Sequence, residues 1–311
     1  MTHDARLRHL LTLDGLGGPR IEALLDAADR LRPHAMGGTA LRHVLAGRTV
    51  CSLFFENSTR TRTSFQLAAQ RLGADVVNFD VGASSVKKGE SALDTLKTLE
   101  AMGADAFVVR HAENGAVAAL ADGAGPRTAL LNAGDGRSAH PTQGLLDMLT
   151  IRQRKGADFA RLSVLIVGDV RHSRVARSDL HALRALGCRD IRVCAPSTLL
   201  PEPATVAGCA VGGDLDAMLD GVDVVMMLRL QRERMEEGLV PSLEQYFRDY
   251  GLDAHRLAKA RPNAIVLHPG PMNRGVEIAG DVADGPQSVI LDQVANGVAV
   301  RMAVLEHLLA N

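Results

Sequence analysis

The segments RTVCSLFF (48–55), ENSTRTRTSFQLAAQRL (56–72) and GADVVNF (73–79) follow one another without a break. The first and last are short, apolar and rich in β-branched and aromatic residues, whereas the middle one has the length and composition of a helix. They predict a strand at 48–55, a helix at 58–72 and a strand at 75–79. A strand, a helix and a second strand in this order form a βαβ unit with parallel strands.

The same alternation continues along nearly the whole chain. Further strands are predicted at 105–110, 128–132, 162–167, 190–194, 222–228 and 264–267. Further helices are predicted at 90–102, 116–121, 141–154, 175–186, 215–219, 254–259 and 288–309. This order predicts an α/β protein with parallel sheets flanked by helices. The stretch KGAD (155–158) is the best boundary between two domains, which places residues 1–154 in the first and 155–287 in the second.

The composition limits the classes of partner. The chain has 311 residues and a net charge of −1, so it has no overall basic field for nucleic acid or an anionic membrane. An anionic substrate would have to be held by local clusters of Arg and Lys. Residues 1–16 carry charges throughout and do not resemble a secretory signal, and no apolar run approaches the ~18 residues of a membrane span. The sequence therefore predicts a cytoplasmic protein.

Four cysteines are scattered at positions 51, 188, 194 and 209, with no Cys-x-x-Cys pair and no His pair at ligand spacing. Cys51, Cys188 and Cys194 lie in or beside apolar segments, where small buried thiols are common. We expect neither a disulfide framework nor a metal site.

Polar groups cluster where the first strand meets its helix, in FFENSTRTR (54–62). Backbone N–H groups at a helix start attract anions, and this stretch adds three hydroxyl donors and two arginines. A Ser or Thr there is more often only a helix cap, but this combination favours a phosphate site. It is not a Walker loop, because the Gly-x-x-x-x-Gly-Lys pattern is missing.

This stretch resembles the phosphate-binding signature of the aspartate/ornithine carbamoyltransferase family, and the resemblance extends along nearly the whole chain. The other matching segments are SSVKKGE (84–90), VRH (109–111), NAGDG (132–136), HPTQ (140–143), GDVRHSR (168–174), RLQ (229–231) and HPGPMNRG (268–275). The resemblance implies two domains, with the C-terminal helix, 288–311, packing back on the first.

The resemblance also implies roles for individual residues in binding carbamoyl phosphate. The expected ligands are Ser58, Thr59, Arg60, Thr61, Ser84, Lys88, Arg110, His140, Gln143, Gly270 and Pro271. Thr61, Arg110, His140 and Lys88 are the expected catalytic residues. Gly270 replaces the leucine of some family members, but the family uses a backbone carbonyl there, which any residue supplies.

Aspartate is the expected acceptor, with Lys88, Arg174, Arg229 and Gln231 as its ligands. Two separate arginines suit a dicarboxylate, because each can form a bidentate pair. Ornithine enzymes of the family carry Ser-Met-Gly and His-Cys-Leu-Pro motifs, whereas this sequence reads MLRLQ (227–231) and HPGP (268–271). Gly168-Asp169 lacks the Gly-x-Gly-x-x-Gly pattern, which argues against a nicotinamide dehydrogenase.

In the family, the residues matching Ser84 and Lys88 enter the active site of a neighbouring subunit. The resemblance therefore implies a homotrimer with shared active sites, acting without a cofactor in pyrimidine biosynthesis. Regulatory chains or a dihydroorotase-type partner are left open. The rival interpretations are a carbamoyltransferase for another amine, such as ornithine, and a catalytically silent structural homologue.

Overall fold

A computed structural model describes residues 7–79, 89–231 and 242–310 of the chain. The chain divides into two compact units, residues 1–146 with 295–311 and residues 147–294. The first division falls within helix α5 (Pro141–Lys155) and the second within helix α11 (Ile290–Leu309). The domain limits inferred from the sequence, 154/155 and 287/288, stay a prediction.

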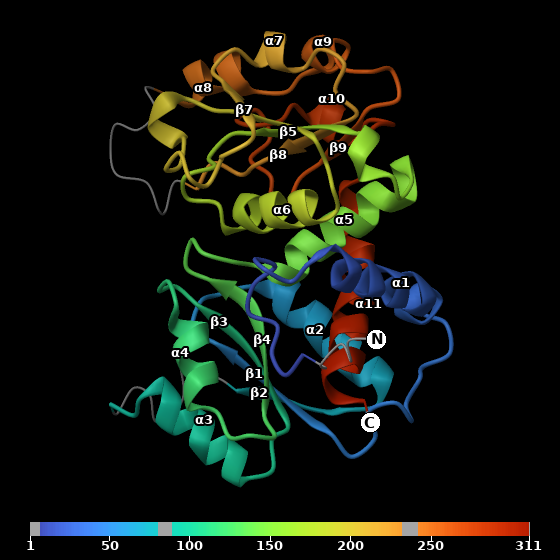
Figure 1. The fold of residues 1–311 in the computed structure, drawn as a ribbon, viewed down its shortest axis with the longest axis vertical. Coiled ribbons are helices and arrows are strands. Elements are labelled where there is room, and N and C mark those ends of the chain that lie inside the picture. The colour runs from blue at the N-terminus through green and yellow to red at the C-terminus, as the bar shows by residue number, and fades with distance from the viewer. Residues whose placement is uncertain (1–6, 80–88, 232–241, 311) are drawn as a thin grey trace. The chain divides into compact units, whose positions relative to one another are not determined.

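The first unit contains a parallel sheet in the order β2-β1-β3-β4 among its described residues. Figure 1 shows α3 and α4 on one face of this sheet and α1, α2 and α11 on the other. The strands are β1 (Thr49–Phe54), β2 (Asp75–Phe79), β3 (Ala106–His111) and β4 (Ala129–Asp135). The helices before α5 are α1 (Gly18–Ala35), α2 (Thr59–Leu72), α3 (Ala92–Ala101) and α4 (Ala116–Gly123).

Helix α2 forms because its apolar residues fall on one face. Thr61, Phe65, Ala68, Ala69 and Leu72 are its buried residues, at the spacing of about 3.6 residues per turn. The helix ends at Gly73, whose φ of 90° is costly for other residues. A Cβ added there would lie 1.9 Å from the Arg42 carbonyl oxygen, so only glycine fits.

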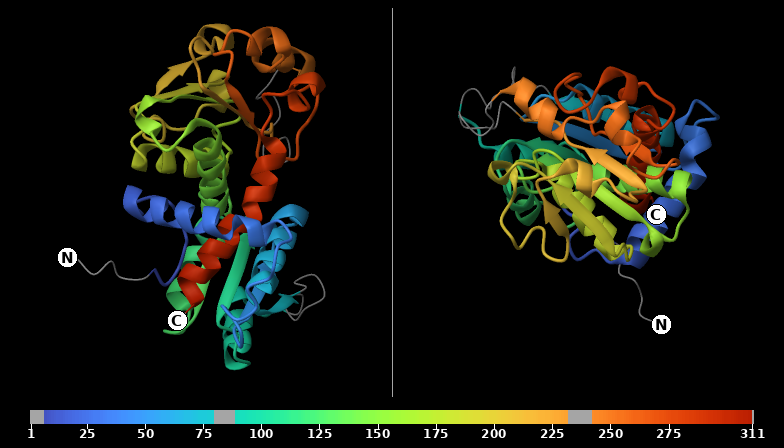
Figure 2. Two further views of the ribbon diagram at one scale, coloured as in Figure 1. Left: turned by 90° about the vertical axis from the view of Figure 1, so that its right-hand side faces the viewer. Right: turned by 90° about the horizontal axis from the view of Figure 1, so that it is seen from above.

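The last part of α11 packs on the helices of the first unit (Figures 1 and 2), as predicted. Arg32 of α1 donates a 3.2 Å hydrogen bond to the Asn296 side chain. The guanidinium of Arg301 lies 5.0 Å from the ring centre of Phe65 in α2. These contacts join the C-terminal segment of the chain to helices near its beginning.

The second unit contains a parallel sheet in the order β7-β6-β5-β8-β9 within the described residues. Its strands are β5 (Ser163–Val167), β6 (Asp190–Cys194), β7 (Ala210–Gly212), β8 (Val224–Met227) and β9 (Ile265–Leu267). Its helices between α5 and α11 are α6 (Arg174–Ala185), α7 (Leu215–Met218), α8 (Leu243–Tyr250), α9 (Ala254–Leu257) and α10 (Gly280–Ala283).

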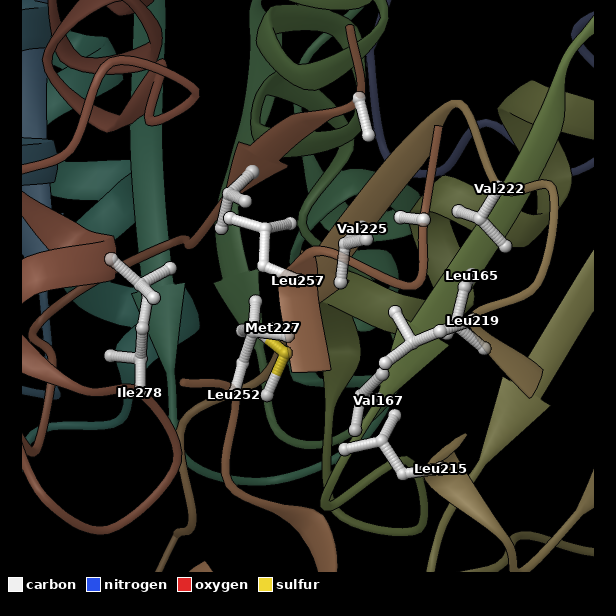
Figure 3. Packing of buried hydrophobic residues seen from close by; sticks show 14 of the residues in the cluster. Leu165, Val167, Leu215, Leu219, Val222, Val225, Met227, Leu252, Leu257 and Ile278 are labelled. Atoms are coloured by element: carbon white, nitrogen blue, oxygen red, sulfur yellow. The ribbon is translucent and has the colours of Figure 1, made fainter. Parts of the chain in front are cut away.

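Alternate residues of the central strands build one core of this unit. Leu165 and Val167 of β5 and Val225 and Met227 of β8 are buried in a single cluster (Figure 3). Residues of α7, α9 and α10 complete it. The intervening strand residues are buried as well, so β5 and β8 are covered on both faces, as is usual for parallel sheets.

The predicted architecture is confirmed. Every predicted strand and helix is present with ends that shift by a few residues, and β4 extends three residues further than predicted. The sequence reasoning missed α1, β7, α8 and α10. The three cysteines predicted to be buried are buried, and all four thiols are free. Within the described ranges, no helix combines the length and hydropathy needed to cross a bilayer.

Two buried carboxyl groups, Asp147 of α5 and Asp179 of α6, lie against each other within the second unit. The side chain of Gln293 donates a 2.6 Å hydrogen bond to Asp147. Burial, and then the neighbouring Asp147 carboxyl, raise the pKa of Asp179 well above the ordinary aspartate value. Asp179 therefore keeps its proton to higher pH in the folded protein than in the unfolded chain.

We expect Asp179→Asn to flatten the decline of stability with increasing pH. The folded protein holds a proton that the unfolded chain releases near pH ~4, so wild-type stability falls as the pH rises from there toward the raised pKa. Asparagine is close in shape to the neutral acid and removes this dependence. Melting temperatures between about pH 5 and 9 measure the effect, with the exposed Asp220→Asn as control. Parallel curves for wild type and Asp179→Asn would contradict the prediction.

Candidate active site

The polar residues of the first unit gather where chain connections leave β1 and β3 in opposite directions. β1 pairs with β2 on one side and with β3 on the other, so its carboxyl end is a topological switch point. Such points are where ligands bind in open α/β sheets. Helix α2 starts just after β1, and the register pairs Phe54 with Arg110 near the end of β3. The two predicted cationic segments therefore lie at neighbouring strand ends.

Ser58 is the N-cap residue of α2, but its side chain makes no capping hydrogen bond to the described residues. The N-cap serines of α3, α6 and α8 do accept such a bond from the backbone. Ser58 is thus unlike an ordinary serine cap. Thr61 is buried, whereas Thr59 and Arg60 are exposed. Arg62 lies over the Phe54 ring at 5.0 Å, a cation–π contact that its spacing alone did not predict.

Arg110 is held in a fixed orientation. Its Nε atom lies 3.3 Å from a carboxylate oxygen of Glu56, and one terminal nitrogen donates a 3.2 Å hydrogen bond to the Ala133 carbonyl. The side chain is only 12% exposed, so the pair is poorly screened by water. Glu56 follows β1 and Ala133 belongs to β4, so Arg110 joins the ends of three neighbouring strands.

His140 and Gln143 stand at the start of α5, after β4. Both side chains are buried, and the His140 carbonyl accepts hydrogen bonds from the backbone N–H groups of Gln143 and Gly144. Asp135 stabilises the connection that precedes them. Its backbone N–H donates a hydrogen bond to the Ala139 carbonyl, and its carboxylate accepts one from the Gly115 N–H at 2.9 Å. The first unit thus brings Ser58–Thr61, Arg110, His140 and Gln143 to the ends of adjacent strands.

The second unit repeats this arrangement. β5 pairs with β6 on one side and β8 on the other, which makes the ends of β5 and β8 a second switch point. Arg174 is the first residue of α6, after β5, and its side chain is buried. Arg229 and Gln231 follow β8 and are half-buried. The two arginines predicted to bind a dicarboxylate therefore follow neighbouring strands.

Asp169 joins the two segments of this switch point. One oxygen of its fully buried carboxylate lies 2.8 Å from the His172 ring and the other accepts a 3.3 Å hydrogen bond from the Gln231 N–H. The Gln231 side chain in turn donates to the His172 carbonyl at 3.2 Å. Burial raises the pKa of Asp169, although its contacts with His172 and Gln231 oppose that rise.

Gly270 and Pro271 follow β9 and are joined by a cis peptide bond. Gly270 has a φ of 62°, in the left-handed region that favours glycine. Ser84 and Lys88 lie outside the described residues. Among residues 7–79, 89–231 and 242–310, no group of three or more His, Cys, Asp or Glu side chains is placed to hold a metal ion.

The comparison with protein families covers both units. Residues 8–153 match the carbamoyl-P binding domain of aspartate/ornithine carbamoyltransferases, and residues 160–308 match their Asp/Orn binding domain. The chain belongs to the aspartate/ornithine carbamoyltransferase family. The resemblance inferred from the sequence is thereby confirmed.

Within this family, the chain is similar to proteins named aspartate carbamoyltransferase catalytic subunit. Identity is 69% over 306 residues to the protein of Xanthomonas campestris pv. campestris, covering 98% of this chain and 97% of that one. It is 69% over 305 residues to that of Stenotrophomonas maltophilia, covering 98% and 96%.

Two solved structures of family members have the same fold. Aspartate transcarbamoylase from Trypanosoma cruzi, in complex with N-(phosphonacetyl)-L-aspartic acid, superposes with a TM-score of 0.86 at 33% identity, covering 97% of this chain and 96% of that chain. Ornithine carbamoyltransferase from Thermus thermophilus gives 0.85 at 28% identity, covering 97% and 99%. The backbone fold alone therefore does not distinguish the two acceptors.

The sequence reasoning missed the groups that hold the candidate ligands in place. Glu56 lies inside the quoted signature and Asp169 inside GDVRHSR, but neither was assigned a role. Glu56 lies two residues before Ser58 and close in sequence to Arg60 and Arg62. An acidic residue beside these arginines was the sequence feature that could have indicated its role. No comparable sequence feature pointed to His172, because its contact with Asp169 depends on the turn after β5.

Proposed function

We propose that this chain transfers the carbamoyl group of carbamoyl phosphate to the amino group of L-aspartate. The products are N-carbamoyl-L-aspartate and phosphate, and the reaction serves pyrimidine biosynthesis in the cytoplasm. Family membership supports carbamoyl transfer. The observation that carries the choice of aspartate is the presence of Arg174 and Arg229 at one switch point. The 69% identity to relatives named for aspartate agrees with it.

The phosphate group is assigned to the residues that offer hydroxyl, backbone and cationic donors. These are Ser58, Thr59, Arg60, Thr61, Ser84, Lys88 and Arg110. The start of α2 supports this assignment, because helix N-termini stabilise anions and the Ser58 side chain makes no capping hydrogen bond to the described residues. Arg110 adds a charge whose direction is fixed by Glu56 and Ala133, so little reorganisation is needed when the ligand binds.

The oxygen of the carbamoyl group is assigned to Thr61, Arg110 and His140. Its nitrogen is assigned to Gln143 and the Gly270 carbonyl. Pro271 shapes the segment that carries Gly270. An amide carbonyl can accept hydrogen bonds from the carbamoyl NH2 group, and the cationic or hydroxyl donors stabilise oxygen as it becomes negative. The buried position of His140 and Gln143 keeps water from competing with these contacts.

Aspartate is assigned to Arg174, Arg229, Gln231 and Lys88. Each arginine can pair with one carboxylate through two parallel hydrogen bonds. The buried Asp169 contact supports this assignment, because it holds the segment carrying Gln231 against the turn that precedes Arg174. A positively charged ornithine side chain would meet Arg229 with like charge, which disfavours that acceptor.

The reaction needs no covalent enzyme intermediate. The neutral amine of aspartate attacks the carbamoyl carbon and forms the C–N bond, giving a tetrahedral intermediate. Its collapse breaks the C–O bond to phosphate, and the departing phosphate takes the amine proton. Ser58 has no neighbouring base in its motif, so it acts as a phosphate ligand and not as a nucleophile. Holding two anions against fixed positive charge supplies much of the rate.

We further propose that the chain works as a homotrimer in which Ser84 and Lys88 enter the active site of a neighbouring subunit.

The direct test of the function is an assay of the purified chain with carbamoyl phosphate and each acceptor. We expect carbamoylation of L-aspartate and not of ornithine. Arg229→Ala should raise the KM for aspartate by roughly ten- to a hundredfold through loss of a charge-assisted pair, while the exposed Arg248→Ala should not. Near-normal activity of Arg60→Ala, or a preference for ornithine, would show the assignment to be wrong.

Shared active sites predict complementation between two inactive variants. Lys88→Ala and Arg60→Ala should each be inactive alone, because each removes a phosphate ligand from every site. After unfolding and refolding together, some sites of a mixed trimer receive both native residues, so the mixture should regain activity. Mass spectrometry confirms mixing. Confirmed mixed oligomers without any activity above the parents would exclude sharing.

A further inference from the structure

A cluster of buried polar side chains surrounds the segment that carries Gly270. The side chains of His268 and Glu277 are completely buried, and His268 Nε2 lies 3.1 Å from a Glu277 carboxylate oxygen. The same carboxylate accepts hydrogen bonds from the backbone N–H of Asn273, at 2.5 Å, and from the Asn273 side chain, at 3.3 Å. Glu277 thus holds both His268, at one end of the segment, and Asn273, at the other.

The contacts of His268 fix which ring nitrogen carries the proton. Nδ1 accepts a 2.8 Å hydrogen bond from the backbone N–H of Gly270, so this nitrogen has no proton. The proton therefore resides on Nε2, which donates a hydrogen bond to the Glu277 carboxylate. The two nitrogens thus act differently, since Nδ1 holds Gly270 while Nε2 anchors the ring.

The backbone of His268 is anchored independently. Its N–H donates a 2.9 Å hydrogen bond to the Gln293 side chain, which donates in turn to the buried carboxylate of Asp147. The next residues offer few other points of attachment. Pro269 and Pro271 have no N–H, so Gly270 carries the one backbone donor of residues 269–271. The His268 ring accepts from this donor.

We propose that His268 is a positioning residue that orients the Gly270 carbonyl toward the carbamoyl nitrogen. This inference rests on the proposed function, in which that carbonyl receives the NH2 group. Gly270 needs an external support because glycine has the widest choice of backbone conformations, and its φ of 62° is only one of them. The bond from its N–H to His268 selects this conformation before the ligand arrives, which reduces the entropy that binding must overcome.

Two substitutions separate the roles of the two ring nitrogens. In His268→Asn, the amide oxygen branches from the same carbon as Nδ1 and can still accept from Gly270, while the contact with Glu277 is lost. In His268→Gln, the longer side chain reaches the place of Nε2 and can still donate to Glu277, while Gly270 loses its acceptor. A purely structural role in pairing Glu277 would make His268→Asn the more damaging change.

The measurement is the KM for carbamoyl phosphate together with competitive inhibition by inorganic phosphate, which lacks the carbamoyl group. We expect His268→Gln to raise this KM about tenfold, the effect of one lost hydrogen bond, and His268→Asn to stay within about threefold of wild type. The inhibition constant of phosphate should stay within about twofold in both variants, because phosphate makes no contact with Gly270.

Several outcomes would overturn the inference: an unchanged KM in His268→Gln, an equal or larger increase in His268→Asn, or parallel weakening of phosphate inhibition. If circular dichroism shows that His268→Gln does not fold, His268→Asn alone decides, since a near-native KM supports the inference and a roughly tenfold increase refutes it. A His268→Asn chain that does not fold would make His268 a stability residue and also refute it. A wild-type chain unable to carbamoylate aspartate would refute the proposed function, and this inference would fall with it.

Discussion

Parallel pairing of β1 with β3, and of β5 with β8, is the constraint on which both groups of candidate ligands depend. In each pair the connections leave the carboxyl ends in opposite directions, toward β2 and β4 in one sheet and toward β6 and β9 in the other. Residues distant in sequence, such as Thr61 and Arg110, thereby lie at neighbouring strand ends. Helices α2 and α6 begin at these points, so their N-terminal N–H groups are placed where they can stabilise a bound anion.

Buried and half-buried carboxylates hold the candidate ligands in place at these strand ends. The chain has nearly equal numbers of acidic and basic residues, 36 and 35, so positive charge is concentrated locally and not by an overall excess. Glu56 fixes Arg110, Asp169 joins the segments of Arg174 and Gln231, and Glu277 holds the ring of His268. A buried carboxylate without a partner is costly, so each pair also stabilises the local fold against rearrangement.

Much of this could be predicted from the sequence. The alternation of apolar segments with helical ones indicated the parallel sheets, and the hydroxyl and arginine residues after β1 marked an anion site. Helix α1 was missed because Pro33 and several charged residues weaken its helical pattern, although its buried face is continuous from Ile21 to Ala35. Helix α8 was missed because its eight residues offer little periodicity, with Tyr246 its one buried residue.

The positioning contacts could not be predicted in the same way. Glu277 is nine residues from His268, and only the turn after β9 brings the two side chains together. Asp169 and Gln231 are separated by 62 positions and meet because β5 and β8 are neighbours. Sequence patterns identify groups able to touch a ligand, whereas the residues that hold those groups depend on strand order and register.

The proposed function requires one chain to present cationic groups both for a phosphate and for the dicarboxylate of aspartate. Isothermal titration calorimetry with N-(phosphonacetyl)-L-aspartate tests it most directly, because this molecule carries both anionic parts and cannot react. We expect this molecule to bind at least about a hundredfold more tightly than phosphate alone, and we expect no comparable gain for the analogue built on ornithine. Equal affinity for the two analogues, or no gain over phosphate, would contradict it.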